Sequence, residues 1–220
     1  MQYIFDEKAG ENHLSLDQSL YKYIVKVRRF QEGDKLFFRN LQNDLLYLYE
    51  IEKITKKEVF LSLKEKISKK ISLEKELEIF WCMIDPKTIE KTLPMLNQIG
   101  VKKITFIYCD RSQKNFKIDF ERLKKIVINS NQQCGRVHIM EFEIVKSLKE
   151  VLEKNRDLVV LDFGGESDFC DIKKVLIGCE GGFTQEERDL LKSQKKVAFS
   201  TQNILKSETA AVAVSSKLLI

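Results

Sequence analysis

Six short runs of apolar residues, spaced from residue 79 onward, constrain the fold more than any other feature of this sequence. The runs are Ile79 to Met83, Ile104 to Tyr108, Val137 to Met140, Leu158 to Leu161, Val175 to Ile177 and Val197 to Phe199. Continuous apolar runs are typical of strands buried on both faces, and strands that alternate with helices form a mostly parallel sheet. We therefore predict an α/β domain over residues 73–220.

Two of the intervening helices have clear start signals. Asp85 is a good N-cap residue and precedes a proline, and Thr184 to Glu187 fits a capping box. Pro94 conflicts with the first of these helices, because an interior proline kinks or breaks a helix.

Residues 1–72 have a different pattern, which predicts a small β-barrel domain. Short β segments alternate with turn residues: they are Tyr3 to Phe5, Lys35 to Phe38, Leu45 to Ile51 and Val59 to Leu63. One helical segment interrupts them, and its expected buried face comprises Leu16, Leu20, Ile24 and Val27. The lysine-rich stretch from Lys64 to Lys75 is predicted to be a solvated linker.

Charge leaves the partner of this first domain open. The net charge of +5 is mild, so its distribution matters more than its size. Tyr21 to Phe30 holds Lys22, Lys26, Arg28 and Arg29 together with two tyrosines and no acid. Such a segment is either an ordinary solvated face or an RNA-binding surface, in which aromatics stack on bases and cations hold phosphates.

Several classes of protein are disfavoured by what the sequence lacks. It has no dinucleotide-binding, P-loop, nucleophile-elbow or zincin motif, and we expect its two histidines to be structural. The start of the chain has no signal-peptide pattern, and no run of 18 apolar residues occurs, so we expect a cytoplasmic protein without a membrane span. Its five cysteines show no metal-binding spacing and are expected to be reduced thiols, with no metal site.

Three loops follow predicted strands near the C-terminus: Asp162 to Gly165, Gly178 to Thr184 and Ser200 to Glu208. Ligands of open α/β sheets bind at such strand-to-loop junctions. Each loop alone could be a plain turn, and Ser207 could simply cap the helix that follows. Three junctions at one end of a sheet favour a pocket.

The second and third loops carry motifs that resemble those of the bacterial 16S ribosomal RNA (uracil-N3) methyltransferase family, a branch of the SPOUT methyltransferases. Gly178 to Thr184 corresponds to the family's Gly-Pro-Glu-Gly-Gly-Phe/Tyr-Ser/Thr motif, and Ile204 to Ala210 to its Ile-Leu-Arg-x-Glu-Thr-Ala motif. The resemblance runs nearly end to end. Cys179 stands where the family has proline, and Lys206 where it has arginine.

The resemblance implies a PUA-like β-barrel over residues 1–72 and a SPOUT α/β domain with a deep trefoil knot over residues 73–220. It implies a cytoplasmic homodimer that binds S-adenosylmethionine and acts on 16S rRNA or the small ribosomal subunit. The cofactor-binding residues that it implies are Leu161, Asp162, Gly164, Ile177, Gly178, Glu180, Gly181, Gly182, Ser200, Ile204, Leu205 and Thr209. The RNA-binding residues are Tyr23, Lys26, Arg28, Arg29 and Arg111.

The implied reaction is methyl transfer from the cofactor's sulfonium to N3 of a uridine, which must be unpaired or extruded from its helix. Lys206, Glu208 and Arg136 are the candidates for orienting the base or easing its deprotonation. Two alternatives remain: an RNA-binding or ribosome-assembly protein of the same fold with weak catalysis, and a SPOUT methyltransferase that acts on another RNA.

Overall fold

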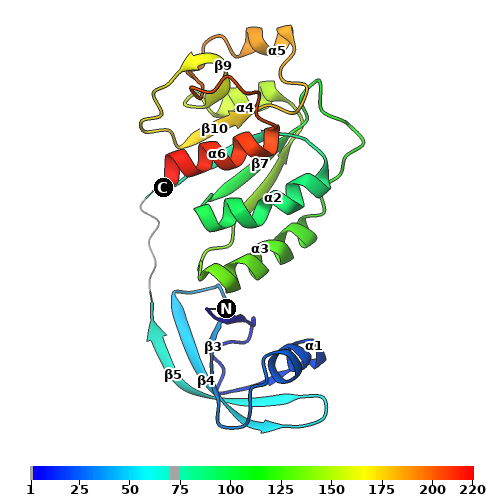
Figure 1. Ribbon diagram of the computed structural model, residues 1–220, viewed down its shortest axis with the longest axis vertical. Coiled ribbons are helices and arrows are strands. Elements are labelled where there is room, and N and C mark those ends of the chain that lie inside the picture. The colour runs from blue at the N-terminus through cyan, green and yellow to red at the C-terminus, as the bar shows by residue number, and fades with distance from the viewer. Residues whose placement is uncertain (1, 70–74) are drawn as a thin grey trace. The chain divides into compact units, whose positions relative to one another are not determined.

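A computed structural model describes residues 2–69 and 75–220 of the chain (Figure 1). The residues form two compact units, and each is described by itself. The first comprises Met1–Ser72 together with Asn131–His138, and the second comprises Leu73–Ser130 and Ile139–Ile220. Nothing in the sequence pattern had indicated that Asn131–His138 groups with the N-terminal residues.

The first unit contains a curled, mostly antiparallel sheet of five strands. The strands are β1 (Ile4–Phe5), β2 (His13–Leu16), β3 (Lys35–Arg39), β4 (Leu45–Ile54) and β5 (Val59–Ser68). Their order is β1-β3-β4-β5-β2, so β1 and β2 are the two edges, and the sheet is an open half-barrel. Only the pairing of β1 with β3 is parallel.

Two predictions for this unit were wrong in part. Lys64 to Ser68 do not belong to a linker, because β5 continues through them and pairs with β4 as far as Leu45; residues 70–74 lie outside the described residues. The predicted helical face also fails at both ends. Leu16 is the last residue of β2, and the side chain of Val27 is 66% exposed.

The helix itself explains the exposure of Val27. A short α-helix, α1 (Gln18–Tyr21), continues into a π-helix, η1 (Lys22–Val27), in which Arg28 N donates to Tyr23 O at 2.9 Å. The wider i→i+5 turn changes the period, so residues three or four apart no longer share one face. Ile24 stays fully buried in the core of this unit.

The second unit is built on a six-stranded, fully parallel sheet with the order β11-β9-β10-β6-β7-β8. The strands are β6 (Glu78–Cys82), β7 (Lys103–Ile107), β8 (Glu141–Val145), β9 (Val159–Glu166), β10 (Lys174–Ile177) and β11 (Lys196–Val197). The helices are α2 (Pro86–Ile99), α3 (Phe120–Cys134), α4 (Leu148–Lys154), α5 (Gln185–Leu190) and α6 (Ser207–Leu219). Among the described residues, no helix is both long enough and apolar enough to cross a membrane.

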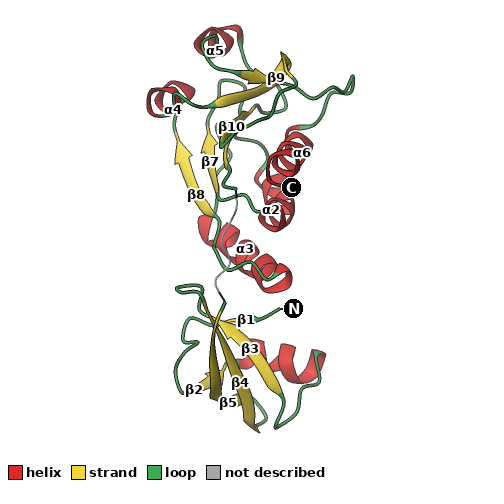
Figure 2. Cartoon of the chain, turned by 90° about the vertical axis from the view of Figure 1, so that its left-hand side faces the viewer, coloured by secondary structure: helices red, strands yellow, loops and turns green. Residues whose placement is uncertain are grey.

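The strand order determines which helices cover which face. The steps from β6 to β7 and from β7 to β8 run one way along the sheet, whereas those from β8 to β9 and from β10 to β11 run the other way. Because crossovers are right-handed, the helices of the two sets lie on opposite faces. Figure 2 shows α2 and α6 on one side of the sheet and α4 on the other, and α6 packs against α2.

Most of the predicted strands are confirmed, but Val137 to Met140 is not a strand. The strand of this region is β8, which lies at the edge of the sheet and reads Glu-Phe-Glu-Ile-Val, with both glutamates exposed. An edge strand is buried on fewer sides, so it lacks the continuous apolar run that identified the central strands. Residues 162–165, predicted as a loop, instead lie within β9, where its register with β11 is irregular.

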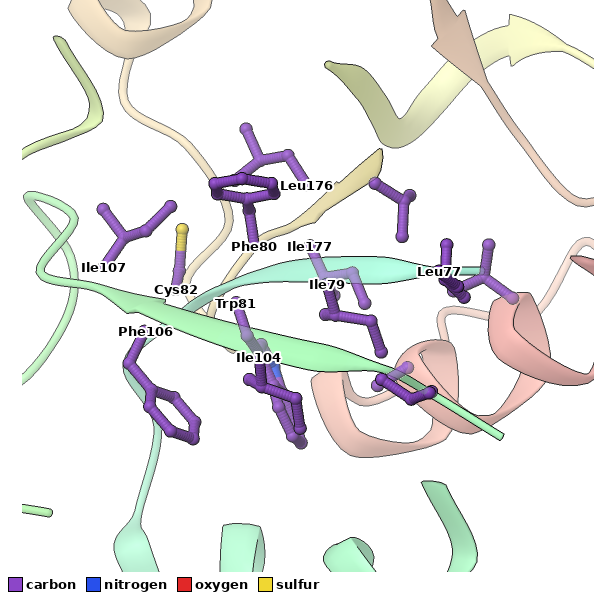
Figure 3. Close-up of a cluster of buried hydrophobic side chains, with 14 of the residues drawn as sticks. Leu77, Ile79, Phe80, Trp81, Cys82, Ile104, Phe106, Ile107, Leu176 and Ile177 are labelled. Atoms are coloured by element: carbon purple, nitrogen blue, oxygen red, sulfur yellow. The ribbon is translucent and has the colours of Figure 1, made fainter. Parts of the chain in front are cut away.

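The core of this unit surrounds the central strands (Figure 3). Trp81 of β6 and Phe106 of β7 are fully buried and stack with their ring centroids 6.5 Å apart. The expected N-cap is confirmed, since the Asp85 carboxylate accepts a hydrogen bond from Thr88 N, and α2 continues through Pro94.

The prediction of five reduced thiols was wrong. Cys82, at the end of β6, and Cys109, just after β7, form a disulfide with their Cα atoms 5.7 Å apart. The two residues are 27 positions apart in the sequence, and only the side-by-side pairing of β6 and β7 brings them together. The other three cysteines are free.

Candidate functional site

A cavity of about 460 Å³ is lined by residues 161–163 of β9 and by the segments at the carboxyl ends of β10 and β11. It lies beside the point where the sheet changes direction, because β10 and β6 are neighbours whose following connections leave in opposite directions. Such switch points are where open α/β sheets bind ligands. The lining residues are Leu161, Asp162, Phe163, Ile177, Gly178, Cys179, Glu180, Gly181, Gly182, Phe183, Arg188, Ala198, Phe199, Thr201, Asn203, Ile204, Leu205, Lys206, Ser207 and Ala210.

The loop Gly178 to Thr184, hereafter the glycine loop, forms one wall of the cavity. It turns sharply, with Gly182 N donating to Cys179 O at 2.9 Å and Gly182 at a φ of 63°, a left-handed conformation that favours glycine. Burial raises the pKa of the Cys179 thiol, which keeps it protonated, and its sulfur donates to Gly182 O at 3.7 Å. The predicted capping box is confirmed: Thr184 and Glu187 each bond the other's backbone N–H.

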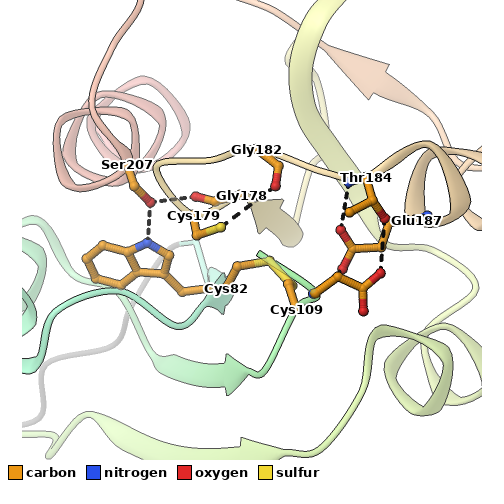
Figure 4. Close-up of a disulfide and its surroundings, with 10 residues drawn as sticks. Cys82, Cys109, Gly178, Cys179, Gly182, Thr184, Glu187 and Ser207 are labelled. Atoms are coloured by element: carbon orange, nitrogen blue, oxygen red, sulfur yellow. Dashed lines mark hydrogen bonds between the residues drawn. A yellow bond between two sulfur atoms is a disulfide. The ribbon is translucent and has the colours of Figure 1, made fainter. Parts of the chain in front are cut away.

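A buried chain of hydrogen bonds joins the glycine loop to α6. Trp81 Nε1 donates to Ser207 Oγ at 2.8 Å, and Ser207 Oγ donates to Gly178 O at 2.5 Å (Figure 4). Ser207 is therefore not the N-cap that the sequence predicted, because Lys206 occupies that position without a side-chain cap. The Ser207 hydroxyl instead fixes the first carbonyl of the glycine loop to the first residue of α6.

An ion pair adds charge to the cavity wall. Arg188 of α5 donates through Nη1 to Asp162 Oδ2 of β9, and the Asp162 side chain is only 8% exposed. No motif in the sequence pointed to Arg188. A usable signal was its spacing, since it lies four residues after the helix N-cap Thr184 and so on the same helical face, next to the loop.

The cavity gathers most, but not all, of the residues predicted to bind a cofactor. Leu161, Asp162, Ile177, Gly178, Glu180, Gly181, Gly182, Ile204 and Leu205 line it. Gly164, Ser200 and Thr209 are not among its lining residues. Gly164, at a φ of 72°, would point an added Cβ into open space. The roles of all twelve remain predictions.

Of the three residues predicted to act on the base, only Lys206 lines the cavity. Glu208 lies in the first turn of α6. Arg136 belongs to the segment that groups with the first unit, where its backbone carbonyl accepts a hydrogen bond from Tyr3 Oη. Burial lowers the pKa of the Arg136 guanidinium to about 10.

Four of the predicted RNA-binding residues lie together around η1. Lys26, Arg28 and Arg29 are exposed, and the Arg28 guanidinium lies 5.8 Å from the ring centroid of Tyr23, which is partly exposed. The fifth, Arg111, lies in the second unit, where its guanidinium Nη1 donates to Gly181 O at 2.6 Å. Arg111 therefore contacts the wall of the cavity.

Two family models match separate ranges of the chain. An RNA methyltransferase domain matches residues 69–219, and an RNA methyltransferase PUA domain matches residues 16–64. The chain is 38% identical to ribosomal RNA small subunit methyltransferase E of Helicobacter pylori, over 98% of both chains. It is 27% identical to the Rickettsia conorii protein of the same name, over 94% of this chain and 86% of that one.

Solved structures share the fold at lower identity. A Legionella pneumophila protein in complex with the cofactor SAM superposes with a TM-score of 0.81 at 23% identity, over 99% of this chain and 96% of that one. Ribosomal RNA small subunit methyltransferase E from Neisseria gonorrhoeae, bound to S-adenosyl methionine, gives a TM-score of 0.80 at 16% identity, over 99% and 96%.

Proposed function

The chain belongs to the ribosomal RNA small subunit methyltransferase E family, and from this premise we propose that it methylates N3 of a uridine in 16S rRNA with S-adenosylmethionine. One observation carries the proposal. The two loops that hold the family's motifs, separated in the sequence by α5 and β11, line one cavity at the switch point of the parallel sheet.

The residues of the cavity fit the cofactor. Its volume of about 460 Å³ lies in the range of small-molecule sites. Glycines at 178, 181 and 182 let a ligand approach the main chain closely, and Leu205 and Ile204 supply apolar surface. S-adenosylmethionine, when bound, supplies a methyl group on a positively charged sulfur; Glu180 supplies negative charge in the lining, whereas the charge of Asp162 is paired with that of Arg188.

The reaction also requires that the N3 proton of the uridine be removed. Loss of that proton leaves negative charge on the uracil ring, which a nearby cation stabilises. We propose Lys206 for this role, because it lines the cavity and is the N-cap of α6. Glu208, two residues further, and Arg136 are the other residues that we propose for orienting the base or easing its deprotonation.

RNA would reach this site through both parts of the chain. The exposed cations around η1, in the segment matched by the PUA model, supply phosphate contacts, and Tyr23 supplies a stacking face. The uridine must leave its stack to present N3. The homodimer, the deep trefoil knot and the cytoplasmic location that the resemblance implies belong to this proposal.

The test is methyl transfer to small ribosomal subunits from a bacterium whose own enzyme has been deleted. Radiolabelled S-adenosylmethionine should label 16S rRNA, and mass spectrometry of the digested nucleosides should find 3-methyluridine. Label at another position of uridine would refute the N3 assignment. Label in another RNA would favour the alternative target, and RNA binding without cofactor binding at millimolar concentration would favour the assembly protein.

A further inference from the structure

The segment directly after β7, residues Cys109 to Ser112, packs against the glycine loop. It forms a turn in which Ser112 N donates to Cys109 O at 3.0 Å, and the disulfide to Cys82 anchors its first residue in the core. Two side chains and one backbone N–H of this turn bond the glycine loop or the helix that it opens.

Arg111 makes the contact nearest to the cavity. Its guanidinium Nη1 donates to the carbonyl of Gly181 at 2.6 Å. Its aliphatic stem covers the same residue so closely that an added Cβ at Gly181 would lie 3.2 Å from Arg111 Cβ and Cδ. Gly181 is among the lining residues of the cavity and Arg111 is not, so Arg111 acts on the wall without being part of the lining.

Glu187 and Asp110 make the second contact. Glu187 is 4% exposed, and its two carboxylate oxygens accept hydrogen bonds from Asp110 N and Thr184 N, each at 2.9 Å. Thr184 Oγ1 donates to Asp110 Oδ2 at 3.0 Å. Figure 4 shows Glu187 beside Thr184. Two hydrogen bonds thereby tie the end of the glycine loop and the start of α5 to the turn after β7, and the third, from Thr184 N to Glu187, holds the carboxylate that receives one of them.

From these contacts we propose that Arg111 is a positioning residue for the cofactor, not an RNA ligand. It holds the Gly181 carbonyl, and with it the glycine loop, in the conformation that binds S-adenosylmethionine. The inference rests on the proposed function. A loop that is ordered before binding loses less conformational entropy when the ligand arrives, so the contact contributes to affinity without touching the ligand.

Three variants test the proposal. Arg111→Met removes the donor but keeps the stem, and Arg111→Lys keeps one cationic donor. Lys114→Met removes an equal charge from the same exposed region, and Lys114 shows no hydrogen bond to the glycine loop in the described part of the chain. Calorimetry should find the Kd for S-adenosylmethionine raised about tenfold in Arg111→Met, within about threefold of wild type in Arg111→Lys, and unchanged in Lys114→Met.

Further measurements separate positioning from a general loss of structure. In Arg111→Met, the KM for the cofactor should rise while kcat at saturating cofactor stays near that of wild type, and Tm should stay near that of wild type because the side chain is exposed. Amide exchange should become faster within the glycine loop. RNA affinity should not change.

Unchanged cofactor affinity in Arg111→Met would overturn the proposal, as would a loss of RNA affinity in Arg111→Met that Lys114→Met does not share. Either result would leave the proposed function intact, provided that the wild-type protein binds S-adenosylmethionine. If the wild-type protein does not bind it, the proposed function itself fails.

Discussion

Ser207 shows how one hydroxyl can join two walls of a site. It is 5% exposed, accepts from Trp81 Nε1 and donates to Gly178 O. Ser207→Ala would leave a buried indole N–H without its acceptor and a loop carbonyl without its donor. We expect a loss of about 1–3 kcal/mol in the free energy of unfolding, measured by urea denaturation, and weaker S-adenosylmethionine binding.

Ser215→Ala is the matched control for that prediction. Ser215 is a fully buried serine on the same helix whose hydroxyl donates to Ala211 O at 2.7 Å, within α6. Removal of the Ser215 hydroxyl should lower the free energy of unfolding by a similar or smaller amount than Ser207→Ala does, and it should leave the affinity for S-adenosylmethionine unchanged. Equal effects of both variants on cofactor binding would show that Ser207 acts only through helix stability.

Two adjacent glycines of β9 should differ sharply in their tolerance of a methyl group. An added Cβ at Gly165 would lie 2.6–2.7 Å from backbone atoms of Val197, whereas one at Gly164 would meet open space at a φ of 72°. Gly165→Ala must push β11 away from β9, so we expect a loss of about 3 kcal/mol. Gly164→Ala carries only the left-handed backbone cost of about 1 kcal/mol.

Thermal or urea unfolding of both alanine variants would check this contrast. Gly165→Ala should also weaken cofactor binding more than Gly164→Ala does, because Ala198 and Phe199, directly after Val197, line the cavity. Similar stability of the two variants would mean that the β9–β11 contact is not as close as the structure describes.

At the scale of elements, the Cys82–Cys109 disulfide ties the end of β6 to the segment after β7. Thiol titration of the denatured, unreduced protein should therefore find three thiols among the five cysteines. Reduction should lower the free energy of unfolding by about 2–4 kcal/mol, because the crosslink restricts the unfolded chain. A Cys82→Ala/Cys109→Ala variant provides the control, since reductant should not change its stability. Five titratable thiols would contradict the bond.

At the scale of the whole molecule, RNA binding and cofactor binding should separate by unit. A Lys26→Gln/Arg28→Gln variant removes two exposed cations from the first unit, and the cavity lies in the second. We expect weaker RNA binding and unchanged affinity for S-adenosylmethionine. The slope of the logarithm of the RNA association constant against the logarithm of the salt concentration should become shallower by about 0.7–0.9 for each lost phosphate contact. Filter binding across a salt series would measure the RNA affinity and this slope.

Lys56→Gln/Lys57→Gln, at the turn between β4 and β5, removes the same charge from an exposed position elsewhere in that unit. This control should retain more RNA affinity than the η1 variant. Equal losses would show that RNA responds to net charge instead of a defined surface.

Sequence patterns identified what depends on local chemistry. The apolar runs of β6, β7 and β10 identified central strands, because burial on both faces leaves little choice of residue. The capping signals at Asp85 and Thr184 are confirmed, since a cap depends on residues within one turn. The same locality explains the failures: β8 is an edge strand without such a run, and the π-helix moved Val27 off the expected face.

The sequence by itself therefore determined the class of fold, the family and the loops that carry its motifs. Tertiary structure alone decided which residues of those loops meet. It made Ser207 a link between two loops, paired Arg188 with Asp162, joined Cys82 to Cys109 and bonded Arg111 to Gly181. Each of these contacts joins residues at least 26 positions apart, and the order of the parallel strands brings them together. Local sequence patterns do not reveal the strand order, because it is determined by packing across the whole sheet.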